Sequence, residues 1–337
     1  MNILLTSVGR RSYIVDYFKQ ALGGEGMVLA ANSERTYALN QADRYVITPL
    51  IYDPDYIPFL LRYCREHRVD ALLSLFDVDL LVLARHRSAF SEIGTQVILA
   101  DDTVVEICND KWQTHELTKR LGLMSPATYT TLEGAQSALV DGELHYPVML
   151  KPRWGMASMG IYTANNDDEL RVLYAKSTED VFTSHLKYES AATRSAAVLI
   201  QQRLVGQEHG LDIVNDLDGN LVALFAKRKV VMRAGETDVG ITVDPEPFLK
   251  MAEAISSTLR HQAILSLDCF QCETGIFITE LNCRISGHYP IAHLAGADVP
   301  LQIVRWLKGE GTDAPLLACK TGVTVIKDLA PRCLDLS

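Results

Sequence analysis

The sequence predicts two architectures in one chain: an α/β region with a parallel sheet over about the first hundred residues, then an α+β region with antiparallel sheets. In the first region, short apolar runs alternate with segments that carry apolar residues at helical spacing, which is typical of βαβ units. Beyond residue 146, strand-like runs follow one another across short turns, which favours antiparallel pairing. Two of these runs flank Glu273-Thr274-Gly275, a sequence typical of a hairpin turn.

The composition is that of a globular enzyme of two or three domains, with 337 residues of which 48% are hydrophobic and 22% charged. A formal net charge of −10 argues against nucleic acid as the main partner, because phosphate backbones require clustered Lys and Arg. No apolar run approaches the ~18 residues of a membrane span. The N-terminus lacks the features of a signal peptide, and the seven cysteines are an odd, scattered set, so we expect reduced thiols and a cytoplasmic location.

The first region supplies its elements in alternation. We expect strands at residues 3–7, 28–31, 45–47, 71–76 and 97–100, and helices at residues 13–21, 57–67 and 80–87. The first strand-to-helix turn has a single glycine, Gly9, and therefore lacks the GxGxxG pattern of dinucleotide-binding sheets. Arg10 and Arg11 stand at the helix N-terminus, where they either hold an anion or only cap and solubilise the helix.

The second region begins with helices and continues as strands. Acidic residues at 101–102 open one helix, and a second starts at Lys111 and is closed by Gly122. Strands are expected at residues 146–152, 198–204 and 221–228, followed by a helix at 299–307 and a last strand at 322–327. The expected domains are residues 1–105, 106–200, 201–310 and a C-terminal extension at 311–337.

The hairpin around Gly275 aligns two acidic residues. In a three-residue loop with Gly275 in the left-handed conformation, Cys272 pairs with Ile276, and Asp268 then falls directly opposite Glu280. Directly opposed residues share one face of the sheet, with Cβ atoms roughly 5 Å apart.

Asn282 lies two residues beyond Glu280 and therefore on the same face. Two carboxylates and an amide oxygen form a hard, oxygen-only ligand set suited to Mg²⁺. Arg284 continues this face with a charge that can stabilise a transferring phosphoryl or acyl oxygen. The alternative interpretation is the exposed face of an ordinary amphipathic hairpin.

Cysteine thiols near the same hairpin raise the alternative of a zinc site. Cys269 and Cys272 form a CxxC pair, with Cys283 and His288 nearby, and zinc binds such side chains. The pair falls inside a predicted strand and lacks a second paired motif, so we expect buried thiols instead.

A phosphate-binding loop is predicted at residues 155–160, which are small and include Gly155 and Ser158. Such residues let backbone N–H groups approach an anion closely, although a plain turn between strands has the same composition. Lys151 precedes the loop on a strand, and a buried lysine there needs an anionic partner such as a phosphate.

Taken in order, these motifs resemble the ATP-grasp superfamily over residues 1 to about 310. The resemblance makes Lys111 and Lys151 the two ATP-phosphate lysines and residues 155–160 the flexible loop over the phosphates. The segment with Gln202, Arg203 and Leu204 lies where the family holds adenine, and Gly206-x-Glu208-x-x-x-Asp212 is similar to a motif whose glutamate meets ribose. Gln202 stands where many members have glutamate.

The resemblance also makes Asp268, Glu280 and Asn282 the Mg²⁺ ligands, with Arg284 as the arginine of that element and Cys283 in place of its usual proline. The first hundred residues then resemble the family's Rossmann-like preATP-grasp domain, followed by a two-lobed ATP-grasp fold. Within the superfamily, residues 233–238 and 285–290 look most like small proteins similar to the carbamoyl phosphate synthase large subunit.

This resemblance implies an ATP- and Mg²⁺-dependent carboxylate–amine ligase, with Mn²⁺ as a possible substitute, that forms an acylphosphate and releases ADP and phosphate. Arg284 and Arg233 are the catalytic candidates, and Glu236, His288, Tyr289 and Arg10 are candidates for substrate contact; a surface ion pair is the alternative for Arg233 and Glu236. The expected partners are a small-molecule carboxylate and an amine, with a homodimer possible. Phosphorylation of a small carboxylate or carbamate and a silent nucleotide-binding regulator remain alternatives; the missing glycines disfavour a dehydrogenase.

Overall fold

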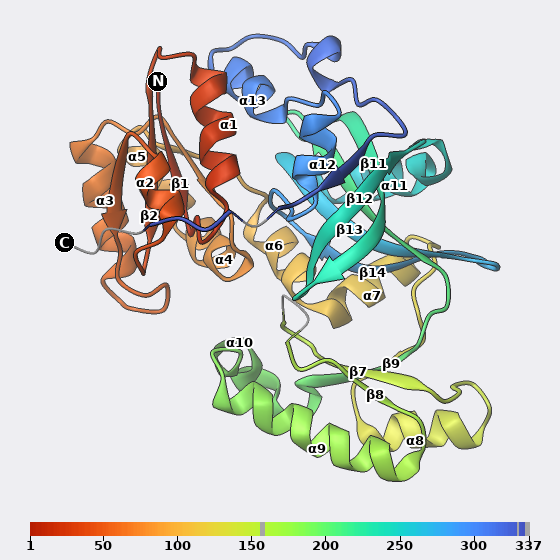
Figure 1. Ribbon diagram of the computed structural model, residues 1–337. Helices are drawn as coiled ribbons and strands as arrows, with labels where there is room; N and C mark the ends of the chain where they lie inside the picture. The colour runs from red at the N-terminus through yellow and green to blue at the C-terminus, as the bar shows by residue number, and fades with distance from the viewer. Residues whose placement is uncertain (156–158, 329, 334–337) are drawn as a thin grey trace.

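The computed structural model describes residues 1–155, 159–328 and 330–333. Three sheets divide between a large body, which holds a five-stranded and a six-stranded sheet, and a smaller lobe below it in Figure 1. The predicted fold class is confirmed, because the first sheet is parallel and the later ones are built from antiparallel pairs.

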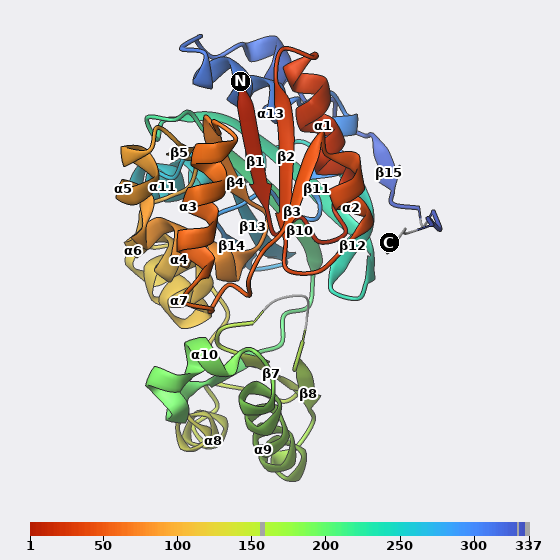
Figure 2. The same ribbon diagram turned by 90° about the vertical axis from the view of Figure 1, so that its left-hand side faces the viewer.

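The N-terminal sheet has the order β3-β2-β1-β4-β5 and is parallel throughout. Its strands are β1 (Asn2–Thr6), β2 (Met27–Asn32), β3 (Arg44–Ile47), β4 (Ala71–Ser74) and β5 (Gln96–Val97). Helices α1 (Ser12–Leu22) and α2 (Tyr37–Gln41) cover one face, and α3 (Tyr56–Glu66), α4 (Asp77–Arg85) and α5 (Arg87–Glu92) cover the other, as Figure 2 shows. Apolar residues therefore fill β1 on both faces, since neither face meets water.

Two predicted strands in this region are too long, and two helices were not predicted. The expected strand at 71–76 ends at Ser74, because Asp77 and Asp79 form the acidic first turn of α4. The strand expected at 97–100 pairs only over Gln96–Val97, and α2 and α5 were not predicted. Those helices have five and six residues, too few for a periodic apolar pattern.

The small lobe is a four-stranded sheet of order β6-β9-β7-β8 with helices on one side. Its strands are β6 (Thr128–Tyr129), β7 (Val148–Pro152), β8 (Tyr162–Ala164) and β9 (Val198–Gln202). The helical segments are α8 (Leu132–Val140), α9 (Asp167–Thr183), α10 (Lys187–Ser190) and the 3₁₀ turn at Ala191–Ala196.

The six-stranded sheet, of order β14-β13-β10-β11-β12-β15, is antiparallel throughout. Its strands are β10 (Gln207–Asn215), β11 (Leu221–Arg233), β12 (Glu236–Val243), β13 (Ala263–Cys272), β14 (Gly275–Asn282) and β15 (Thr324–Ile326). The remaining helices of this body are α6 (Asp102–Asn109), α7 (Lys111–Arg120), α11 (Leu249–Leu259), α12 (Tyr289–Leu294) and α13 (Val299–Leu307), with short 3₁₀ turns at Glu246–Phe248 and Ala314–Leu317. The predicted last strand is confirmed as β15, which completes one edge of this sheet.

The hydrophobic cores show which parts of the molecule are packed together. One core joins Leu4 of the first sheet to Leu265 of the six-stranded sheet, and a second joins Phe18 of α1 to Ile303 of α13. The small lobe has a core of its own, around Leu150 and Ile200. The two larger sheets therefore form one body, and the small lobe is packed independently. Within the described residues, no helix has both the length and the apolar character needed to cross a bilayer.

Candidate functional site

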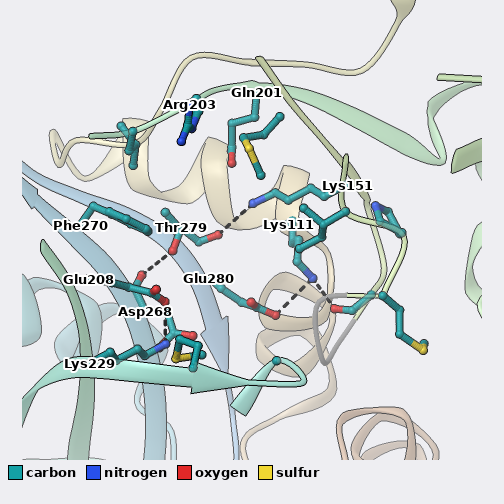
Figure 3. Close-up of a pocket in the computed structure, with 18 of the residues that line it drawn as sticks. Lys111, Lys151, Gln201, Arg203, Glu208, Lys229, Asp268, Phe270, Thr279 and Glu280 are labelled. Carbon is teal, nitrogen blue, oxygen red and sulfur yellow. Dashed lines mark hydrogen bonds and ion pairs between the residues drawn. The ribbon is translucent and has the colours of Figure 1, made fainter. Parts of the chain in front are cut away.

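A cavity of about 560 Å³ lies between the small lobe and the six-stranded sheet. Its volume is that of a site for a nucleotide-sized molecule. Figure 3 shows Lys151 and Gln201 entering it from the small lobe and Asp268 and Glu280 from the opposite sheet. Lys111, at the start of α7, reaches the cavity from the side.

The β13–β14 hairpin brings the two predicted acids together. Asp268 pairs directly with Glu280, and Ser266 pairs with Asn282, as the sequence predicted. The predicted turn is wrong: Cys272 pairs with Gly275, so the loop has two residues. An irregularity beyond Asp268 adds one residue to β14 and restores the predicted register at the acids.

The extra residue of β14 is Thr279, whose hydroxyl donates to the Asp268 carbonyl oxygen at 3.0 Å. Gly275 has φ +145, not the left-handed value expected, and a Cβ there would lie 2.5 Å from Met124 Sδ. The backbone conformation therefore favours glycine here, and a larger residue would also have to displace the Met124 side chain.

Each cavity carboxylate of this pair has a lysine beside it. Glu280 Oε1 lies 3.2 Å from Lys111 Nζ, and Asp268 Oδ1 lies 2.8 Å from Lys229 Nζ. Lys229 also donates to Glu208 Oε1 at 2.8 Å. Burial opposes ionisation of Asp268, but Lys229 and His288 outweigh it and hold the pKa of that carboxyl well below its ordinary value. Burial opposes the charge of Lys229, but the carboxylates of Asp268 and Glu208 outweigh it and raise the pKa of this lysine.

Lys151 differs from the other two lysines. Its ammonium is buried and lies 3.5 Å from the carbonyl oxygen of Thr279, a neutral acceptor. Burial, together with the charge of Lys111, lowers the pKa of Lys151 to about 8. An anion in the cavity would restore its ordinary basicity, which is the behaviour expected of a phosphate-binding lysine.

The entrance to α7 is fixed by a buried ion pair. Asp110 caps the helix by accepting from Trp112 N, and Arg153 donates to both of its carboxylate oxygens at 2.7 and 2.6 Å. Lys111 also donates to the Gly155 carbonyl oxygen. These contacts tie the residues before the 155–160 loop to α7. Ser158 lies outside the described residues.

The end of strand β9 forms another wall of the cavity. Strand β9 ends at Gln202, so Arg203 and Leu204 line the cavity from outside the sheet ladder. The side chain of Gln202 accepts from Ala127 N at 3.2 Å, and Gln201 donates to Thr128 Oγ1 at 2.8 Å. With both glutamines engaged within the small lobe, the backbone of residues 203–204 is the natural partner for a planar base.

The donor set suits Mg²⁺. Asp268 and Glu280 face the cavity as ionisable oxygen ligands, the type that this cation prefers. Asn282 lines a smaller adjoining pocket, which also has Glu280 in its wall. No cluster of three or more His, Cys, Asp or Glu able to hold a metal occurs in the described residues, which leaves the zinc alternative without support.

Arg284 makes an unexpected contact across the molecule. Its Nε and Nη2 donate to Asp77 Oδ2 of α4 at 2.9 and 2.7 Å, and neither residue lines the large cavity. Arg11 also lies at this junction, donating to the carbonyl oxygens of Leu75 and Ile285. Arg10, the residue named from the sequence, is exposed.

The remaining substrate candidates lie outside the cavity. Arg233 pairs with Asp238 at the surface, while Glu236 lies 3.1 Å from Lys327 Nζ and 3.7 Å from Arg11. Tyr289 is fully buried; its hydroxyl donates to the Ala297 carbonyl oxygen and accepts from Val299 N, the arrangement of a core side chain.

His288 is buried in a polar network beneath the cavity floor. Its ring lies 3.0 Å from Ser266 Oγ and 2.9 Å from Ser286 Oγ, and burial lowers its pKa to about 4. The ring packs on Gly210, where a Cβ would come within 2.7 Å of it. His288 therefore supports Asp268 from behind, at 3.6 Å, as a neutral imidazole.

In sum, nine predicted residues line the large cavity: Lys111, Lys151, Gly155, Gln202, Arg203, Leu204, Glu208, Asp268 and Glu280. Their individual roles stay predictions. Lys229 was missed, although the sequence contains its signal: Lys227 and Lys229 alternate along β11, and Lys227 forms a fully buried pair with Asp212 of the Gly206–Asp212 motif.

Comparisons with known proteins agree with this geometry. A family model described as "PylC-like, N-terminal domain" matches residues 3–98, and one described as "ATP-grasp domain" matches residues 144–278. The carbamoyl phosphate synthase large chain of Thermotoga petrophila is 24% identical over 304 residues, which are 82% of this chain and 26% of the relative. The chain thus spans about a quarter of the length of that relative.

Two solved structures share the fold. The biotin carboxylase domain dimer of Hydrogenobacter thermophilus 2-oxoglutarate carboxylase, solved with MgADP, ADP and bicarbonate, has a TM-score of 0.74 at 17% identity, covering 96% of this chain and 73% of that one. An L-amino acid ligase from Bacillus licheniformis has a TM-score of 0.65 at 17% identity, covering 94% and 77%. The chain therefore contains an ATP-grasp domain, with a PylC-like N-terminal domain ahead of it, and has a fold like that of biotin carboxylases.

Proposed function

We propose that this protein is a carboxylate–amine ligase that consumes ATP and forms an amide or peptide bond through an acylphosphate. One observation carries the proposal: two lysines, Lys111 and Lys151, converge with the opposed Asp268 and Glu280 on a single cavity of about 560 Å³ between two lobes. Cations for phosphates and carboxylates for a metal, held by separate lobes, are the parts that phosphoryl transfer needs.

In this proposal Lys151 and Lys111 bind the phosphates, and the backbone of residues 203–204 holds the base. Asp268 and Glu280, with Asn282, would hold Mg²⁺, which neutralises charge on the phosphates when bound. Lys229, paired with Asp268 and Glu208, holds those side chains in place. The chain thus contributes mainly positioning and fixed charge.

The atoms balance over two steps. A substrate carboxylate oxygen attacks the γ-phosphorus, and the bond from that phosphorus to ADP breaks, with the electron pair leaving on ADP. The amine, having given one proton to solvent, then attacks the acyl carbon. The carbon–oxygen bond to phosphate breaks, phosphate takes the second amine proton, and the products are an amide, ADP, phosphate and one released proton.

Phosphorylation of bicarbonate, carbamate or another small carboxylate is the second candidate. Its support is the similarity to a carbamoyl phosphate synthase large chain and to a biotin carboxylase domain solved with bicarbonate. An aminated product distinguishes ligation from phosphorylation alone. The paired charges in the cavity disfavour a silent regulator, because such a protein needs no ionised carboxylates beside the phosphate lysines.

The test is carboxylate-dependent ADP release, measured with MgATP and a panel of amino acids and sugar acids in the presence of hydroxylamine. Hydroxylamine converts any acylphosphate to a hydroxamate, whichever amine is the natural acceptor. Hydroxamate formation with one class of organic carboxylate identifies the acid that is phosphorylated, and an amide formed when an amine replaces hydroxylamine supports ligation. ADP release that requires bicarbonate alone, without hydroxamate from any organic acid, would favour the second candidate.

A further inference from the structure

A second, much smaller pocket adjoins the large cavity behind Glu280. It measures about 20 Å³, which is room for one group the size of a water molecule. Glu280 and Gly155 line both spaces, so the two are separated by little more than one side chain. The pocket also takes Asp77 from α4, Asn109 from α6 and Glu189 from α10.

This pocket gathers acceptor oxygens that lack donors. Among the described residues, no hydrogen-bond partner reaches Asp77 Oδ1, Asn109 Oδ1 or Glu189 Oε2, although all three atoms are buried. Asp77 is 7% exposed, and its other oxygen is taken by Arg284. Leaving buried acceptors unsatisfied is costly, so such a cluster indicates a ligand that donates hydrogen bonds.

The charges around the pocket do not cancel. Asp77 is paired with Arg284, and Glu280 with Lys111. Glu189 accepts from the neutral hydroxyl of Tyr52. Three carboxylates thus line the pocket, and among the described residues no basic side chain does, which favours a cationic ligand.

The geometry of the donors favours an ammonium group over a metal ion. No three acidic, histidine or cysteine side chains in the described ranges converge closely enough to share a metal. The acceptors come instead from three separate elements, and an ammonium nitrogen carries three N–H donors, one for each of them. Trp154 and Leu186 complete the wall with apolar surface suited to the carbon next to that nitrogen.

Glu189 is held in place by contacts between the lobes. The rings of Tyr52 and Tyr188 stack at 4.3 Å, and the Tyr52 hydroxyl donates to Glu189 Oε1. In both Figure 1 and Figure 2, α10 is the part of the small lobe that faces α4. The pocket is therefore assembled only when the small lobe lies against the large body.

From these observations we infer that the pocket formed by Asp77, Asn109, Glu189 and Glu280 binds the protonated primary amino group of the acceptor substrate. The role of that group as acceptor rests on the proposed ligase function. An amine held there lies beside Glu280, at the border of the cavity in which the carboxylate would be activated.

The binding step is tested with methylammonium chloride as the probe, added to the full chain with MgADP present. We expect a saturable rise in unfolding temperature beyond that given by equal concentrations of potassium or tetramethylammonium chloride. Glu189→Gln, which keeps an oxygen for the Tyr52 hydroxyl, should lose this rise. Glu253→Gln, exposed on α11, should retain it.

Two results would overturn the inference: an equal rise with potassium, which would make this a metal-cation site, or an unchanged rise in Glu189→Gln. If that variant does not fold, Tyr52→Phe replaces it, because Tyr52 is 39% exposed and its hydroxyl positions Glu189; an undiminished rise there also refutes the site. Failure of the ligase function is seen separately, as absence of an amide product in the wild type. In the assay with an amine acceptor, Glu189→Gln should have a KM for the amine about tenfold higher than that of the wild type and an unchanged KM for ATP.

Discussion

The large cavity and the small pocket, which both have Glu280 in their walls, hold opposite kinds of unpaired group. In the large cavity Asp268 and Glu280 each have a lysine within 3.2 Å, and a third lysine, Lys151, has no carboxylate partner. In the small pocket the situation is reversed: within the described residues no basic side chain lines it, and three buried acceptor oxygens have no donor. A surplus of positive charge predicts an anionic ligand such as a triphosphate, and a surplus of acceptors predicts a cationic one.

The excess of positive charge in the large cavity and the excess of acceptor oxygens in the small pocket meet at one side chain. Glu280 contributes to both spaces, and Arg284 contributes to the pocket only through Asp77. The predictions that follow begin with Glu280, which lines both spaces, and end with Gln202 at the end of β9.

Glu280→Gln is expected to have the largest effect. The substitution removes one charge from the predicted metal site and from the wall of the amine pocket, while the hydrophobic cores are untouched. Loss of one electrostatic stabiliser typically costs on the order of 10²–10³ in rate. ADP release under saturating MgATP should fall by that amount, with Glu253→Gln near the wild type. Normal turnover in Glu280→Gln would mean that the hairpin is structural and the proposed function wrong.

Arg284→Ala tests whether this arginine acts in catalysis, as the sequence predicts, or holds Asp77. Both side chains of the pair are nearly buried, at 12% and 10% exposure, and removing one partner of a buried pair costs about 3 kcal/mol. We expect a clear fall in the free energy of unfolding, measured by urea titration. The matched control is Arg233→Ala, which breaks a surface pair whose arginine is 43% exposed and should cost about 1 kcal/mol or less.

An unchanged free energy of unfolding in Arg284→Ala, with lost turnover, would restore the direct catalytic role. Unfolding without lost turnover at low temperature would instead make Arg284 a residue that positions Asp77 and the wall of the pocket.

Much of this arrangement was predictable because it depends on local spacing. Asp268 and Glu280 are opposed because they lie on adjacent strands of one hairpin. The predicted loop was one residue too long, but the extra residue of β14, Thr279, restores the predicted register at the two acids. The positions of Lys111 and Lys151, at a helix start and on a strand before a small-residue loop, are likewise read from a few neighbouring residues.

Contacts between distant segments could not be predicted in this way. Arg284 and Asp77 are 207 residues apart, and neither position carries a local sign of the other. Tyr289 was expected near the substrate, but α12 turns its ring into the core that joins the two sheets. Spacing gives the face of an element, and only tertiary packing decides what that face meets.

The unpaired lysine of the cavity predicts a pH dependence. The pKa of Lys151 is lowered to about 8, from 10.5, so above pH 8 the free protein has lost this proton. A bound triphosphate favours the charged form, and binding must then take up a proton. ATP affinity should therefore fall by up to about tenfold per pH unit above pH 8, and calorimetry in buffers of different ionisation enthalpy should show proton uptake.

The control for this dependence is Lys151→Arg, whose guanidinium stays charged over the whole range. Its affinity profile should be flat above pH 8. An identical slope in the two proteins would assign the titration to another group and leave Lys151 without the predicted role.

Gln202→Glu is expected to have the smallest effect. The change restores the glutamate that the superfamily resemblance leads one to expect, but this side chain points to Ala127 N at 3.2 Å and not to the phosphate lysines. A carboxylate oxygen can accept the same hydrogen bond, and its charge is exposed to solvent, where interactions are weak. ATP affinity, measured by titration, should change by less than about threefold, which corresponds to roughly 0.6 kcal/mol. A larger loss would show that nucleotide binding depends on the Gln202 side chain itself, and the role proposed for the backbone of residues 203–204 would have to be revised.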